Sequence, residues 1–238
     1  MSFEQDLRRR VVHYLELQTT ERRGLRSVVA NISARLPDTV IFGGMMREFA
    51  LGNARNFTSD IDLVSAASSE AIVTAIADYL PTRNKFGGFR FTVNQRRFDI
   101  WALQDTWAFK QGYVSAPSFE NLLKTSFFNL DAAFFHLGSR QVTTHEGYER
   151  WIATSLLEIN LESNPRPANM VRRALDLVIE NQLTVGNRLV RFLAVHAHEH
   201  RENLSWPQVT LLESVSTFTG LNVGSGYRFQ PQNHLLVQ

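Results

Sequence analysis

The chain has 238 residues, 44% of them hydrophobic and 20% charged, with a net charge of +2, which is ordinary for one large folded domain or two small ones. It contains no cysteine, which excludes disulfide frameworks, thiolate metal sites and cysteine nucleophiles and favours a reducing compartment. We find neither an apolar run of the roughly 20 residues that a membrane helix needs nor the core of a signal peptide, so we expect a cytoplasmic protein.

Two helices are expected before the first strand. Residues 3–17 and 25–36 carry apolar stripes at helical spacing, and Pro37 ends the second stripe. Residues 40–42 then predict a short strand that ends at Gly43-Gly44, where a segment of helix-forming composition begins. The order is therefore helix, helix, strand, glycine turn, helix.

A second strand and a hairpin are expected next. Residues 61–64 form a short apolar strand, and Ser68 can cap a helix that continues to Tyr79. Apolar and polar residues alternate over 89–93 and again over 98–102, and Asn94-Gln95 supplies a turn between the two runs.

The second half of the sequence is mostly helical in its pattern. Helical spacing runs from Phe119 to Phe134 and returns over 170–179 and 189–195, whereas the glycines of 220–226 indicate an irregular tail. We therefore expect an α+β fold with a catalytic domain over residues 1–115, and a helical region with an irregular tail over 116–238.

Asp60 and Asp62 are separated by one residue, so on a strand both carboxylates leave the same face while Ile61 points into the core. Two carboxylates this close repel each other, and a hard divalent cation such as Mg²⁺ relieves the repulsion. A pair of solvated aspartates at a strand end is the alternative interpretation.

The glycine pair has two interpretations as well. Between a strand and a helix, Gly43-Gly44 lets backbone N–H groups approach a phosphate, and Arg47 can add a charged contact; the alternative is a tight turn beside a surface arginine. Arginine suits phosphate, and only three of the 25 basic residues of this chain are lysines.

Asp99 is the third candidate carboxylate, on a strand that the hairpin can place beside the Asp62 strand. An inward-facing aspartate between Phe98 and Ile100 is costly unless a charged group meets it, whereas an outward-facing one would carry no such meaning. Taken together, three carboxylates beside an anion-binding turn favour a two-metal phosphoryl-transfer site.

These residues resemble a known family. The segment IFGGMMREFALGNARNFTSDIDLV resembles the head-domain signature of class II CCA-adding enzymes and bacterial poly(A) polymerases, in the DNA polymerase β-type nucleotidyltransferase superfamily. The hairpin FGGFRFTVNQRRFDIWAL is similar to the one that carries the third carboxylate of that family, and SFFNLDAAFF and ESNPRPANMVRRALDL are similar to two later segments. The resemblance covers about residues 25–195.

The resemblance implies a polymerase β-like head, with a mixed sheet and flanking helices, followed by a helical neck-like extension. It also implies a metal-dependent enzyme that transfers NMP from an NTP, ATP among them, to an acceptor hydroxyl and releases pyrophosphate. Asp60, Asp62 and Asp99 would be the catalytic residues and the ligands of two Mg²⁺ ions. The implied nucleotide-binding residues are Gly43, Gly44, Arg47, Arg55, Asp131 and Arg173.

Several positions depart from the family pattern. Lys124-Thr125-Ser126 stands near the place of an R-R-D triplet, Asp131 stands near a usual asparagine, and Asp176 replaces an arginine. No segment matches E-D-x-x-R, the element with which CCA-adding enzymes read cytosine and adenine. The choice of nucleotide is therefore open.

The acceptor is open too. An RNA 3′ end, such as that of tRNA, is the first expectation, and a protein or small-molecule hydroxyl is the second. A noncatalytic nucleotide-binding or partner-binding protein of the toxin-antitoxin type is the alternative from another class. Because little of the chain lies outside residues 25–195, we expect a small acceptor, or recognition supplied by a partner protein or a second copy of the chain.

Overall fold

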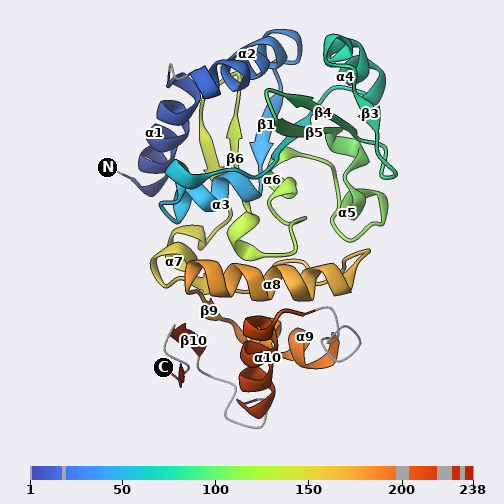
Figure 1. Cartoon of the computed structure of the whole chain (residues 1–238). Coiled ribbons are helices and arrows are strands. Elements are labelled where there is room, and N and C mark those ends of the chain that lie inside the picture. The colour runs from blue at the N-terminus through green and yellow to red at the C-terminus, as the bar shows by residue number, and fades with distance from the viewer. Residues whose placement is uncertain (1, 18–19, 197–203, 219–226, 231–233, 238) are drawn as a thin grey trace. The chain divides into compact units, whose positions relative to one another are not determined.

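The structure is a computed structural model that describes residues 2–17, 20–196, 204–218, 227–230 and 234–237 (Figure 1). The chain forms two compact units, the first from residues 1–126 and 131–148 and the second from residues 127–130 and 149–238. No helix of the described part is long and apolar enough to cross a membrane.

The first unit is built on one sheet with helices around it. Its helices are α1 (Phe3–Glu16), α2 (Thr20–Arg35), α3 (Gly44–Ala50), α4 (Ser69–Ala75), α5 (Trp107–Lys110) and α6 (Phe119–Leu122), with 3₁₀ turns at Ala54–Asn56, Ala77–Tyr79 and Leu103–Asp105. Its strands are β1 (Thr39–Phe42), β2 (Ile61–Ser65), β3 (Thr82–Arg83), β4 (Phe89–Val93), β5 (Arg96–Ala102), β6 (Ala133–His136) and β7 (Val142–Thr144).

The seven strands lie in the order β3-β4-β5-β2-β1-β6-β7. Only β2 and β5 pair in parallel; the other neighbours are antiparallel, so the sheet is mixed as expected. The sheet continues past residue 115, where the sequence analysis divided the chain, because β6 pairs with β1 and β7 with β6.

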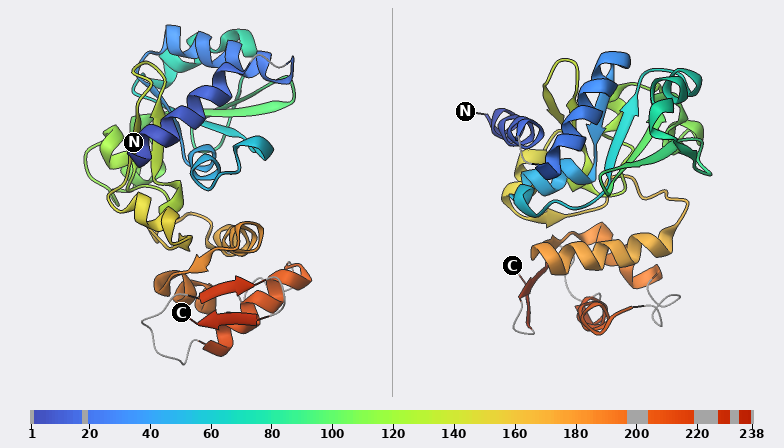
Figure 2. Two further views of the ribbon diagram at one scale, coloured as in Figure 1. Left: turned by 90° about the vertical axis from the view of Figure 1, so that its left-hand side faces the viewer. Right: turned by 45° about the horizontal axis from the view of Figure 1, so that its top comes forward.

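Apolar side chains alternate between the two faces of the central strands. Ile41 and Leu63 are fully buried on one face, while Val40 and Val64 are fully buried on the other. On the Val40 face, a core cluster includes Leu122 and other residues that follow β5 in sequence. Helix α3 packs on β1, β2 and β6, and α1 packs on β7 and α3. Figure 2 shows α1 outside the sheet from two further sides.

The hairpin forms as the alternation predicts. Asn94 and Gln95 both have positive φ, 49° and 63°, which suits a two-residue turn whose twist matches that of the flanking strands. A turn at these two residues places Arg90 opposite Asp99 and Thr92 opposite Arg97. The turn therefore sets the register of the strand that carries the third carboxylate.

The prediction of a continuous helix from Phe119 to Phe134 is wrong. Helix α6 ends at Leu122, a 3₁₀ turn spans Asn129–Asp131, and β6 follows at Ala133–His136. Three of the four residues of β6 are buried, because the strand is covered on both faces. A continuous apolar run of this kind cannot be distinguished from a buried helix by its spacing alone.

The second unit contains α7 (Tyr148–Ala153), α8 (Pro167–Asn181), α9 (Asn187–His196) and α10 (Trp206–Phe218), and α8, α9 and α10 pack on one another. It also contains a four-stranded sheet of β8 (Leu156–Leu157), β9 (Thr184–Val185), β10 (Tyr227–Gln230) and β11 (His234–Val237). The expected irregular tail thus contains two paired strands, β10 and β11. Its glycine-rich segment, residues 220–226, lies outside the described residues.

Two polar residues organise this second unit. The carboxylate of Glu158 accepts hydrogen bonds from the backbone N–H groups of Arg188 (3.1 Å) and Leu189 (2.8 Å), and so caps the first turn of α9. Asp176, which stands at an arginine position of the pattern that the sequence resembles, accepts a hydrogen bond of 2.5 Å from the amide of Gln208 on α10. The departure at Asp176 is thus matched by a contact between α8 and α10.

Candidate active site

One row of side chains crosses the sheet at the expected site. Phe42 on β1 lies opposite Asp62 on β2, Asp62 lies opposite Asp99 on β5, and Asp99 lies opposite Arg90 on β4. Directly opposed residues point to the same face, and neighbouring strands are about 4.8 Å apart. Asp99 therefore faces inward beside Asp62, as the sequence analysis required, and it is 9% exposed.

Arg90 neutralises Asp99 in this structure. Its Nε donates to one carboxylate oxygen at 2.9 Å and its Nη2 to the other at 2.7 Å, a two-pronged geometry that is strong for this pair of groups. Hydrogen bonding to Asp99 and the charge of Asp99 raise the pKa of Arg90. The Arg90 side chain is 46% exposed, so it can leave Asp99 without unpacking the core.

Asp60 has a similar partner. Its carboxylate accepts a hydrogen bond of 3.0 Å from Nε of Arg97, which is the residue opposite Asp60 in the extension of the β2–β5 pairing. Both side chains are substantially exposed. Within the described residues, no three acidic or histidine side chains converge closely enough to hold a metal ion as they stand. The structure thus brings Asp62 and Asp99 together and directs Asp60 to Arg97.

The donor set nevertheless fits Mg²⁺. Asp62 and Asp99 line one cavity from adjacent strands, and carboxylate oxygens are the ligands that this cation prefers. Asp60 precedes β2 by one residue and can join them by rotating away from Arg97, whose side chain is 55% exposed. A divalent cation would replace the positive charge that Arg90 and Arg97 now supply.

The glycine turn lies at the same edge of the sheet. Gly43 follows Phe42 directly and has φ 75° and ψ −123°, a conformation that a residue with a side chain adopts only at a cost. A Cβ built at Gly43 meets no atom within 4 Å, so the glycine is required by its backbone angles and the space beside it is open. Gly44 begins α3, so the turn joins β1 to a helix N-terminus as expected.

Arg47 is buried in an ion pair rather than exposed to a ligand. It is 5% exposed, and its guanidinium pairs with Asp131 and with Glu48. Burial acts to lower the pKa of Arg47, but the charges of Asp131 and Glu48 outweigh it and raise that pKa. Burial raises the pKa of the neighbouring Tyr148 hydroxyl. Asp131 therefore serves here as the counter-ion of Arg47, which gives both expected nucleotide-binding residues a structural contact.

The other two expected nucleotide-binding residues lie elsewhere. Arg55 is exposed in the 3₁₀ turn after α3 and lines a hollow with Arg10 and Tyr14, separate from the cavity of Asp62. Arg173 is exposed on α8 in the second unit. Arg55 therefore lies outside the cavity that contains Asp62 and Asp99, and Arg173 belongs to the other unit.

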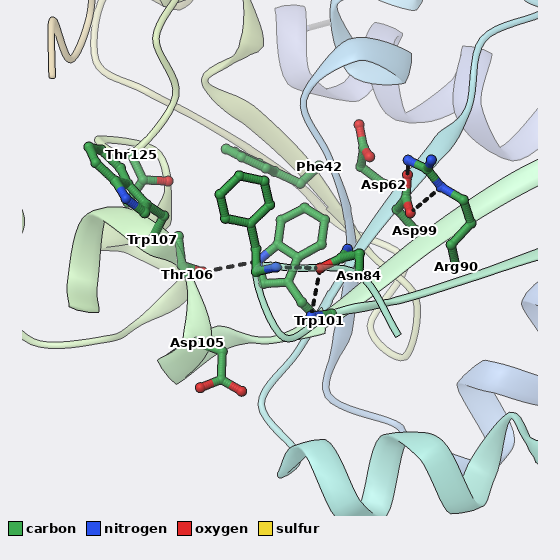
Figure 3. A pocket seen from close by; sticks show the side chains of 12 residues that line it. Phe42, Asp62, Asn84, Arg90, Asp99, Trp101, Asp105, Thr106, Trp107 and Thr125 are labelled. Atoms are coloured by element: carbon green, nitrogen blue, oxygen red, sulfur yellow. Dashed lines mark hydrogen bonds and ion pairs between the residues drawn. The ribbon is translucent and has the colours of Figure 1, made fainter. Parts of the chain in front are cut away.

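That cavity has a volume of about 370 Å³, which is within the range of small-ligand sites. Figure 3 shows Asp62, Asp99 and Arg90 at one end of it, Trp107 and Thr125 at the other, and Phe42, Trp101 and Asn84 between them. The remaining lining residues are Phe86, Gly88, Asp105 and Thr106.

Sequence reasoning missed Arg90 and Arg97 as partners of the carboxylates. For Arg90 the signal was available in the two-residue turn at Asn94-Gln95, because such a turn pairs residues whose numbers are equally distant from it. The contact of Arg97 with Asp60 depends instead on β2 pairing with β5. Counting outward from the turn places Arg90 opposite Asp99. The cavity residues 84–88 lie on a loop before β4, and no spacing in the sequence marked them.

The mixed sheet with its flanking helices agrees with the head fold that the resemblance implied, and solved structures allow a direct comparison of the fold. No protein-family model matches the chain, and none of the curated proteins matches its sequence.

Solved structures of CCA-adding enzymes have the same fold. A CCA-adding enzyme in complex with CTP superposes with a TM-score of 0.59 at 14% identity, over 90% of this chain and 51% of the other. The Thermotoga maritima CCA-adding enzyme complexed with tRNA superposes with a TM-score of 0.57 at 15% identity, over 87% of this chain and 50% of the other. A tRNA nucleotidyltransferase with a primer tRNA and an incoming ATP analogue superposes with a TM-score of 0.51 at 13% identity, over 79% of this chain and 55% of the other.

These matches confirm the fold class that the resemblance implied. The chain spans about half the length of the solved structures that it matches. At this level of identity the likeness extends to the fold, and the activity is argued separately from the residues of the site.

Proposed function

We propose that the protein is a Mg²⁺-dependent nucleotidyltransferase that transfers NMP from an NTP to an acceptor hydroxyl, with an RNA 3′ end as the acceptor. The observation that supports this most directly is the placement of Asp62 beside Asp99 on adjacent strands, within a cavity and next to the Gly43 turn. The related folds are described in complexes with CTP, an ATP analogue and tRNA, which supports nucleotide and RNA ligands.

The reaction requires balanced bond changes at phosphorus. The acceptor oxygen forms a bond to the α-phosphorus of the NTP, the bond from that phosphorus to the bridging oxygen of the β-phosphate breaks, and pyrophosphate leaves. When bound, Mg²⁺ would be held by Asp60, Asp62 and Asp99, and would stabilise the charge that develops on the phosphate oxygens.

The residues of the chain have distinct tasks in this proposal. Asp99, once released by Arg90, accepts the proton of the acceptor hydroxyl. The space beside Gly43 is open, and a triphosphate that enters it can approach the N–H groups of the first turn of α3. Arg90 is exposed enough to move from Asp99 to a phosphate of the substrate.

The acceptor could instead be a hydroxyl of a protein or a small molecule, a proposal that the missing E-D-x-x-R element favours. One experiment separates the possibilities: the purified protein is incubated with each labelled NTP, Mg²⁺ and total RNA in a protein extract. Label in RNA supports the first proposal, and label in protein or in a small product supports the second. No label in any fraction overturns the assignment of transferase activity.

Variants connect the activity to the site. We expect Asp62→Asn and Asp99→Asn to lower the rate of transfer at least about a hundredfold, because each removes a charged ligand of the cation. The matched control is Asp78→Asn, which neutralises a surface carboxylate of the same unit, 71% exposed, outside the cavity. Circular dichroism should show all three variants folded. Full activity in both site variants would refute the assignment.

A further inference from the structure

The cavity that contains the carboxylates continues well beyond them. Asp62, Asp99 and Arg90 occupy one end, and Trp107 lies at the other end (Figure 3). Aromatic side chains contribute much of its wall, namely Phe42, Phe86, Trp101 and Trp107. A metal and a phosphate need only the carboxylate end, so the aromatic end is left for a base, either that of the NTP or that of the acceptor.

The loop before β4 holds one of these aromatic residues at the surface. The side-chain oxygen of Asn84 accepts hydrogen bonds from the backbone N–H groups of Phe86 (2.9 Å) and Gly88 (3.1 Å), and the backbone N–H of Asn84 donates to Gly88 at 2.8 Å. A Cβ at Gly88 would lie 3.0 Å from Cβ of Trp101, so the loop packs closely against the cavity wall. Phe86 remains 45% exposed on this well-bonded loop.

Polar groups accompany the aromatic wall. Because its oxygen accepts two N–H groups, the amide of Asn84 has a defined orientation, and within the described residues its nitrogen donates to no protein acceptor. Thr106 accepts a hydrogen bond of 3.0 Å from Nε1 of Trp101, which fixes the indole ring. The ammonium of the exposed Lys85 lies 5.2 Å from the centre of the Phe86 ring. A planar ligand with hydrogen-bond acceptors and a nearby phosphate suits this set of groups.

We propose that the aromatic end of the cavity binds the base of the 3′-terminal nucleotide of an RNA acceptor, stacked against Phe86 and Trp107, with Asn84 donating to an edge of the base. Aromatic side chains bind bases of single strands in this way with little sequence preference, and a cation at the rim attracts the backbone. This inference rests on the proposed function, because that function places the reacting hydroxyl at Asp99.

The acceptor is favoured over the incoming NTP as the occupant. The cavity is lined by Asp99, where the proposal places the acceptor hydroxyl, whereas neither Gly43 nor Gly44 lines it. A nucleotide whose triphosphate lies on the glycine turn would approach the carboxylates from the β1 side. Nine of the twelve residues that line the cavity belong to the segment 84–107, whereas β1 contributes Phe42 alone.

The test measures RNA binding without turnover, by the fluorescence anisotropy of a short 5′-labelled RNA oligonucleotide in the presence of Mg²⁺ and without NTP. We expect Phe86→Leu, which keeps an apolar side chain but loses the ring, to weaken binding roughly tenfold, and Phe86→Trp to retain it. Leu80→Ala is the matched control, since Leu80 is 86% exposed and lies outside the cavity. It should bind as the unaltered protein does.

A second oligonucleotide, with an abasic ribose at its 3′ end, identifies the group that is bound. The unaltered protein should bind it roughly tenfold more weakly than the complete oligonucleotide, and Phe86→Leu should bind the two almost equally. Equal binding of both oligonucleotides by the unaltered protein, or no loss in Phe86→Leu, would overturn the proposal. If Phe86→Leu raises the KM for NTP but leaves RNA binding unchanged, the proposal is overturned too, and the cavity is assigned to the incoming nucleotide.

Failure of this inference is distinguishable from failure of the proposed function. If the labelled-NTP experiment shows transfer but the oligonucleotides bind without regard to the terminal base, only the aromatic subsite is refuted. If no transfer occurs but binding depends on the terminal base and on Phe86, the subsite stands and the transferase assignment is refuted. Absence of any RNA binding by the unaltered protein overturns the subsite as an RNA site.

Discussion

Arg47→Met tests the role of the buried ion pair in the first unit. Methionine keeps much of the aliphatic length of arginine but removes the guanidinium that pairs with the Asp131 carboxylate. The side chains of Arg47 and Asp131 are only 6% and 11% exposed, so water cannot replace the lost partner. Removal of one partner from a buried pair costs about 3–5 kcal/mol.

This magnitude is large relative to the total stability of most domains, about 5–15 kcal/mol. With a urea dependence of about 2 kcal/mol per molar, the unfolding midpoint of the first unit should fall by roughly 2 M. The transition is followed by circular dichroism and by tryptophan fluorescence.

A double variant provides the control. Arg47→Met combined with Asp131→Leu removes both charges, and an apolar pair should restore most of the stability that Arg47→Met loses. A loss under about 1 kcal/mol in Arg47→Met, or a double variant whose loss equals the sum of the two single losses, would refute the account of Arg47 as half of a buried pair.

Three further predictions concern other parts of the structure. Arg90→Gln should change the unfolding free energy by less than about 1 kcal/mol, because the arginine is half exposed. In calorimetric titration, the same variant should reach half-saturation at a lower Mg²⁺ concentration, because Arg90 no longer competes with the cation for Asp99. A higher concentration at half-saturation would contradict this competition. Gly43→Ala should lower the free energy of unfolding in urea by about 1–3 kcal/mol, because alanine is strained at these backbone angles although its Cβ meets no other atom. An unchanged unfolding midpoint would show that the turn relaxes. Glu158→Ala should lower the free energy of unfolding by about 1–2 kcal/mol, because it removes the cap of α9. Hydrogen exchange should show faster exchange of the amide of Leu189, and unchanged protection of that amide would disprove the capping role.

The local sequence was informative where short-range physics decides the structure. The two-residue turn at Asn94-Gln95 sets the hairpin register, and alternation along β2 sends Ile61 and Asp62 to opposite faces. The same reasoning identified Ser68 as a helix cap, since its hydroxyl accepts from the N–H of Ala71. These features depend on residues within a few positions of each other.

The sequence was misleading where burial is decided by distant segments. The apolar run that became β6 has no periodic signature, because pairing with β1 and cover on both faces remove the alternation that marks a surface strand. The cavity behind the carboxylates likewise depends on a loop at residues 84–88 meeting Trp101 and Trp107.

The sequence by itself determined the carboxylates, the glycine turn and the hairpin, and through their resemblance to a known pattern it determined the fold class. The same hairpin turn places Arg90 opposite Asp99, nine positions away. Only the tertiary structure decided the buried ion pair of Arg47 and Asp131, which are 84 positions apart in sequence. The physical reason is that spacing along the chain sets the direction of a side chain, but the charge it meets is brought by another segment.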